Sequence, residues 1–250
     1  MLRTVDEIKA QITPNLQRLL DDVLLGAEDQ RPLMFGNEEE FKTVKGMPFP
    51  AETNACFNPF RDRFVIFLKR IDTIGLKEEH DIAHELGHLW LLFLGLPSEK
   101  RSSDADRQAR WDSFFSPLRE IMEHAVYYPL MKDKYQIDLY KIGNERLTDF
   151  ITDQLPNIGN KSVPEKLLLI LNYIKYEVES DDHYWLDRLH ETYSKQAPDA
   201  MQIANGLLPP IQKLAGTKDA KLFVSRYRET LETLDTHFDI PVEIWPAFVG

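Results

Sequence analysis

A His-Glu-Leu-Gly-His motif at residues 84–88 is the feature that most constrains what this 250-residue chain can fold into. Apolar residues around the motif recur at the spacing of one helix face, and Gly95 with Pro97 then ends the pattern. The apolar positions are Ile82, Leu86, Leu89 and Phe93. The sequence therefore predicts that the motif lies inside one amphipathic helix.

The spacing of the motif suits a zinc ion. On a helix His84 and His88 leave the same face one turn apart, so both imidazoles can bind one tetrahedral zinc. Glu85 points in another direction, from which its carboxylate can reach a water on the metal without displacing it. Zinc lowers the pKa of such a water to about 7, so Glu85 can act as general base near neutral pH. These residues predict a metallohydrolase with one Zn²⁺ ion.

A β-hairpin is expected directly before the motif helix. Residues 54–57 and 63–71 flank a turn-like segment at 58–62, and the second flank is rich in branched and aromatic residues. A further short strand is expected over 41–44. The motif helix is thus predicted to follow a small sheet.

In this context the sequence resembles the zincin metallopeptidases. The motif after a strand, with a later helix that carries a glutamate, is most similar to the gluzincin branch, and more distantly to ImmA/IrrE-type proteins. The metzincin branch needs a third histidine soon after the motif, where this chain has apolar residues and Gly95. The resemblance implies a zincin-like core in which His84 and His88 bind zinc, Glu85 is the base and a distal acid completes the site.

A third zinc ligand is expected on a second helix over 111–131, because a catalytic zinc takes three protein ligands and keeps one position open. Arg119 and Glu123 are expected to face solvent, opposite the apolar stripe of that helix. Glu120 and His124 are four residues apart beside the stripe, so both can face the motif helix. The pattern favours Glu120 as the ligand, with His124 as the alternative; the other would orient the site.

Two tyrosines follow on the same helix. Tyr127 and Tyr128 are candidate hydrogen-bond donors to the oxyanion formed during hydrolysis, although tyrosines in helices more often pack in the core.

The predicted fold class is α+β and mostly helical, with a small sheet or hairpin, an active-site helix and a helical C-terminal half. We expect a zincin-like metallopeptidase core over residues 1–140 and an α-helical subdomain over 141–250, with a soft boundary. Proline and glycine separate the later helices. These helices are expected at 143–155, 163–178, 183–195, 198–213 and 217–237.

The net charge and the cysteine content limit which binding partners and which cellular location are expected. A formal net charge of −11 at pH 7 disfavours nucleic acids and anionic membranes, so neither is an expected partner. The opening residues lack the apolar run of a secretory signal, and the single cysteine, Cys56, cannot form an internal disulfide. A cytoplasmic location is expected. The sequence makes no prediction of the oligomeric state.

The leading functional hypothesis is a zinc peptidase that hydrolyses a peptide or protein substrate, held as an extended strand at the exposed edge of the hairpin. A regulatory or binding protein that keeps a zincin fold and zinc site is the alternative. A zinc hydrolase acting on another type of bond is a third possibility.

Overall fold

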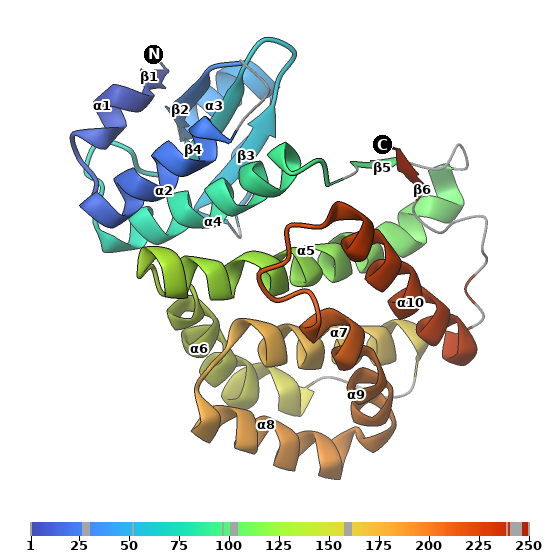
Figure 1. Ribbon diagram of the computed structural model, residues 1–250. Helices are drawn as coiled ribbons and strands as arrows, with labels where there is room; N and C mark the ends of the chain where they lie inside the picture. Colours follow the sequence, from blue (N-terminus) through green and yellow to red (C-terminus); the bar gives the residue numbers. More distant parts are fainter. Residues whose placement is uncertain are drawn as a thin grey trace. The chain divides into compact units, whose positions relative to one another are not determined.

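The computed structural model describes residues 2–26, 31–51, 53–96, 98–100, 105–157, 162–238, 240 and 247–249 (Figure 1). Helices predominate in that part of the chain and strands are few and short, which confirms the expected mostly helical α+β class. The chain divides into two compact units. One comprises Met1–Gly95 with Met131–Asp138, and the other comprises Leu96–Leu130 with Leu139–Gly250. The expected boundary at residue 140 stays a prediction.

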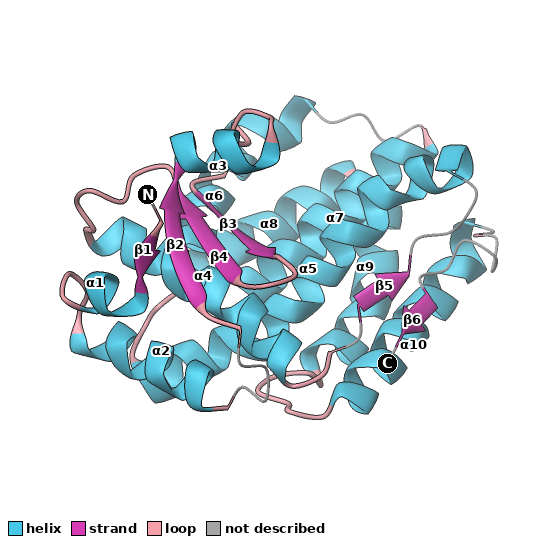
Figure 2. Ribbon diagram, turned by 90° about the horizontal axis from the view of Figure 1, so that it is seen from above, coloured by secondary structure: helices cyan, strands magenta, loops and turns pink. Residues whose placement is uncertain are grey.

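A four-stranded sheet in the order β1-β2-β4-β3 forms the centre of the first unit (Figure 2). Strands β2 and β4 are parallel, and the two outer pairs are antiparallel. The predicted hairpin is confirmed as β3 and β4, and all residues of β4 are buried. In this strand order, β3 forms one edge of the sheet. The strands are β1 (Arg3–Thr4), β2 (Leu33–Asn37), β3 (Ala55–Pro59) and β4 (Phe64–Leu68).

The strand expected over 41–44 is wrong, because these residues belong to helix α3 (Glu38–Lys45). The local signal for that helix is a capping box: the Asn37 side chain accepts from the Glu40 N–H, and Glu40 accepts from the Asn37 N–H. The aromatic ring of Phe41 then packs on Phe49 and Phe67 in an edge-to-face arrangement. Capping at the first turn outweighs the strand propensity of the following residues.

Besides α3, the first unit contains the helices α1, α2 and α4, and α2 and α4 pack side by side (Figure 1). Helix α2 begins with Pro14 at its first position. The Glu79 carboxylate of α4 accepts 2.7 Å hydrogen bonds from the N–H and the hydroxyl of Thr13, which precedes α2. Glu79 thereby ties the start of α2 to α4. These helices are α1 (Val5–Lys9), α2 (Pro14–Leu25) and α4 (Leu76–Phe93).

Helix α4 confirms the predicted motif helix. Glu78 accepts a hydrogen bond from the N–H of Gly75 at its start, and Gly95 adopts a φ of 74° just after its end. The apolar face packs against α2, β3 and β4. Its buried apolar residues are Ile82, Ala83, Leu86, Leu89 and Leu91.

The second unit is built mainly of helices, and α9 packs against both α7 and α10 (Figure 1). The later helices confirm the prediction closely, although β6, paired with β5, was not expected. Helix α5 is longer at both ends than the predicted 111–131, and its last turn belongs to the first unit. The elements are β5 (Ser98–Lys100), α5 (Ala105–Tyr135), α6 (Tyr140–Asp149), a π-helical turn (Phe150–Gln154), α7 (Val163–Glu179), α8 (His183–Gln196), α9 (Pro198–Gln212), α10 (Ala220–Phe238) and β6 (Ala247–Val249).

Among the residues that the structure describes, no helix has the length and apolar character needed to cross a membrane.

Candidate metal centre

Helix α4 places the two motif histidines on one face, as predicted. The Nε2 atoms of His84 and His88 are 3.2 Å apart, and the rings meet edge to face with centroids 4.9 Å apart. Both residues are partly buried. Because the apolar face of α4 is anchored on the sheet and on α2, the orientation of this histidine face is fixed within the first unit.

The motif glutamate, Glu85, is buried beside the edge strand. Its Oε2 accepts a 2.7 Å hydrogen bond from the backbone N–H of Phe57 in β3. In the hairpin, the Phe60 N–H donates to the Arg63 carbonyl, and the Lys69 N–H donates to the Asn54 carbonyl. Along antiparallel strands, residue pairs with such hydrogen bonds alternate with pairs that have none. Phe57 opposite Ile66 is therefore a pair without ladder bonds. The Phe57 N–H points outward from the sheet, where it reaches Glu85.

The single cysteine lies next to this contact. Burial, and after it the nearby Glu85 carboxylate, raise the pKa of the Cys56 thiol to about 11. The Asn58 amide donates a weak hydrogen bond to the sulfur at 3.4 Å, which opposes the shift. Cys56 is thus a neutral thiol at ordinary pH and reports on the charge of Glu85.

In the second unit, His124 of α5 is paired with an acid that the sequence did not single out. His124 Nδ1 lies 2.7 Å from Oε1 of Glu179, at the end of α7, and each side chain is only 2% exposed. Burial alone would raise the pKa of Glu179, but the attraction of His124 and its hydrogen bond lower the pKa below the ordinary value. Glu179 is therefore ionised and accepts, and His124 Nδ1–H donates.

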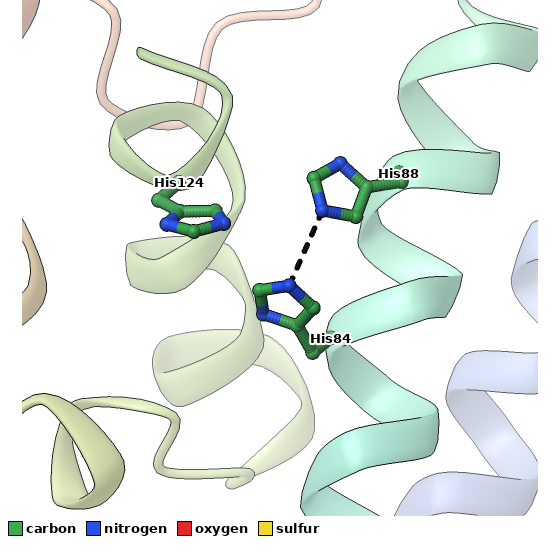
Figure 3. Close-up of side chains that lie close together, drawn as sticks. All are labelled: His84, His88 and His124. Atoms are coloured by element: carbon green, nitrogen blue, oxygen red, sulfur yellow. Dashed lines mark hydrogen bonds between the residues drawn. The ribbon is translucent and has the colours of Figure 1, made fainter. Parts of the chain in front are cut away.

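The ligand atoms of His84, His88 and His124 all lie within 4.8 Å of one another (Figure 3). The three histidines are therefore close enough to bind one metal ion. Imidazole nitrogen is a favourable ligand for zinc, copper, iron and nickel. Since Nδ1 of His124 bonds to Glu179, Nε2 is the nitrogen of that ring that a metal would take.

The structure places the other predicted ligand differently. The Glu120 side chain is 54% exposed, with Oε1 3.8 Å from Nε2 of His124, and it is not part of the three-histidine cluster. The expectation that Arg119 and Glu123 face solvent is wrong. Glu123 is buried and pairs with Arg119 at 2.7 Å. A neighbouring cation on the same helix makes this burial of a carboxylate tolerable.

Tyr127 and Tyr128 are both buried around His124. The Tyr128 ring stacks on the His124 ring with centroids 4.8 Å apart, and Tyr127 meets it edge to face at 5.5 Å. Burial raises the pKa of Tyr128 well above its usual value, so its hydroxyl keeps its proton. The two rings thus restrict how His124 can rotate, while their predicted role as oxyanion donors stays a prediction.

A cavity of about 540 Å³ also lies in the first unit, where the parallel strands β2 and β4 end and α3 and α4 begin. Basic Lys69 and Arg70 line it together with acidic Glu38, Glu39 and Glu78. Because the charges are mixed and none of the predicted site residues lines this cavity, we assign it no ligand.

No protein-family model, curated protein or solved structure matches the chain. The zincin resemblance therefore depends on the motif and its local context.

Proposed function

We propose that the chain is a zinc-dependent peptidase of the zincin type, in which His84, His88 and His124 bind one zinc ion. The observation that carries this proposal is the cluster of the three histidines, whose ligand atoms lie within 4.8 Å of one another. Three protein ligands with one open position is the arrangement of a catalytic rather than a structural zinc. His124 replaces Glu120 as the preferred third ligand, because Glu120 is exposed and outside the cluster.

The donor set fits zinc in its chemistry. All three ligands are neutral imidazoles when bound, as in the three-histidine catalytic zinc sites. A zinc ion held by His84, His88 and His124 would lower the pKa of a bound water toward neutrality and polarise a carbonyl oxygen. The chain's own residues then have to move the proton and hold the substrate.

Glu85 is the proton carrier in this proposal. The Phe57 N–H holds its Oε2, so Oε1 is the oxygen that we assign to accept the proton of the attacking water and to pass it to the leaving amine. The fixed carboxylate has little freedom to rotate. A base held in one orientation loses less entropy on reaching the transition state.

Strand β3 is the proposed docking site for the peptide, because it is the edge strand of the hairpin, whereas β4 lies inside the sheet. On the outer side of β3 the carbonyl of Ala55 accepts from the Thr53 hydroxyl at 2.6 Å. The Phe57 carbonyl points to the same side. A substrate N–H that donates to this carbonyl would lie beside Glu85, with the peptide extended along β3.

The Glu85–Phe57 hydrogen bond also favours a second candidate function. A buried carboxylate that joins α4 to β3 stabilises the fold without any catalysis. In that case the chain is a regulatory or binding protein in which zinc only holds the helices. The two candidates differ in whether Glu85 is needed for turnover.

The Glu85→Gln variant tests the proposal, with Glu78→Gln on the same helix as the matched control. We expect both variants to bind zinc like the wild type, and Glu85→Gln to lose at least about 100-fold in cleavage of a mixed fluorogenic peptide library. Cleavage by Glu85→Gln at the wild-type rate would refute the assignment of the base. Zinc binding without cleavage of any library member by the wild type would favour the binding protein.

A further inference from the structure

The buried pair of His124 and Glu179 stands out in the second unit. Two ionisable side chains that are each 2% exposed have lost nearly all their hydration. Such pairs add little to stability, because the cost of desolvation offsets most of the attraction. The position of Glu179, 2.7 Å from the ring of a candidate metal ligand, suggests a role other than stability.

A carboxylate beside a histidine selects one form of the ring. Nδ1 of His124 lies 2.7 Å from Oε1 of Glu179, the arrangement in which a ring N–H donates to a carboxylate oxygen. This leaves the lone pair on Nε2 of His124. Metal-binding histidines commonly donate their second N–H to a carboxylate, which fixes the ring and makes it a stronger ligand.

The end of α7 is itself held firmly by α6, which fixes the place of Glu179. Gly143 of α6 lies so close that a Cβ atom there would be 1.7 Å from the carbonyl oxygen of Glu179. Asn144 follows, and its Oδ1 accepts from the Ser180 hydroxyl at 2.6 Å and from the N–H of Asp181 at 3.1 Å. The residues just after Glu179 therefore have a fixed backbone.

We propose that Glu179 is a positioning residue of the metal centre, held by Gly143 and Asn144, which presents His124 with its Nε2 to the zinc ion. This inference rests on the proposed zinc site. It gives part of the helical C-terminal region a function, namely to support the third ligand.

The chain offers a matched control on the same helix. Glu177 of α7 pairs with Nε2 of His190, whereas Glu179 pairs with Nδ1 of His124, and His190 is not part of the three-histidine cluster. Substitution of Glu177 therefore removes an acid–histidine pair of similar chemistry without touching the metal ligands.

The experiment measures zinc affinity of the full-length Glu179→Gln and Glu177→Gln proteins by competition with a chromophoric chelator, and the melting temperature of each metal-free protein. The glutamine amide can donate or accept, so it no longer enforces the required form of His124. We expect zinc affinity to fall about 10- to 100-fold in Glu179→Gln and to stay unchanged in Glu177→Gln. The visible spectrum of the cobalt-loaded protein should change only in Glu179→Gln.

The Asn144→Ala variant covers the case in which Glu179→Gln does not fold. It keeps the acid–histidine pair but releases the segment after Glu179, so we expect a smaller loss of zinc affinity, of severalfold. If the wild type binds zinc and the folded variants bind it with unchanged affinity, the proposed role of Glu179 is overturned. The proposed zinc site is not affected by that result. A wild type that binds no zinc would overturn the proposed function as well.

Discussion

The backbone N–H of Phe57 donates a 2.7 Å hydrogen bond to the carboxylate of Glu85, so the acid of the motif is anchored on the edge strand of the sheet. This contact joins a residue of β3 to a residue of α4, 28 positions later in the chain. Both residues belong to the first unit, so the orientation of the proposed general base depends only on contacts within that unit.

Replacing Phe57 by proline removes that N–H and leaves the ladder bonds of the hairpin in place, because Phe57 does not pair with β4 through its N–H. The Phe57→Ala variant is the control, since it loses the stacking on Phe64 but keeps the donor. A buried carboxylate that loses a partner costs about 1–3 kcal/mol. Urea denaturation should therefore show Phe57→Pro to be less stable than Phe57→Ala by about this amount. Equal stability of the two variants would mean that the contact contributes nothing.

Cys56 gives a readout of the charge on Glu85 that needs no substrate, because it is the only cysteine of the chain. With its pKa raised to about 11 by burial and by Glu85, about one thiol in a thousand is ionised at pH 8. Alkylation by iodoacetamide should be slow at pH 8 and should speed up as the pH rises toward 11, because the thiolate is the nucleophile.

The Glu85→Gln substitution removes the negative charge beside the thiol, so the pKa of Cys56 should fall and alkylation at pH 8 should become several times faster. Mass spectrometry of the intact protein measures both rates. An unchanged rate in Glu85→Gln would show that the carboxylate does not act on this thiol.

Substitution of two glycines in the second unit by alanine should change the stability of the protein in opposite directions. At Gly143 the new methyl group would overlap the carbonyl of Glu179, so we expect Gly143→Ala to destabilise the protein by about 2 kcal/mol or more. At Gly206 the nearest atom is the Thr233 methyl carbon at 3.9 Å, so Gly206→Ala should add up to about 1 kcal/mol of helix stability. Chemical denaturation measures both. A neutral Gly143→Ala would contradict the close packing of α6 on α7.

The main elements could be predicted from sequence because their signals are local. The period of 3.6 residues around the motif identified α4, and the branched residues of the 63–71 segment identified β4. The sequence signal for helix α3 is the capping box of Asn37 and Glu40, which outweighs the strand propensity of the next residues.

The third ligand was harder to predict for a physical reason. Helical spacing gives the face on which a residue lies but not the neighbour that covers it, so Glu120 and His124 looked equivalent. The partner that distinguishes His124 is Glu179, 55 residues later in the chain. A buried glutamate at the end of an apolar helix also has no local signal that separates it from an exposed one, because its burial depends on that distant histidine.

X-ray absorption spectroscopy at the zinc edge, on protein loaded with one equivalent of zinc, tests the central claim most directly. The account predicts three imidazole nitrogens at about 2.0–2.1 Å in the wild type and in Glu120→Ala, and two in His124→Ala. A carboxylate oxygen of Glu120 in place of the third imidazole, or zinc without histidine ligands, would contradict it.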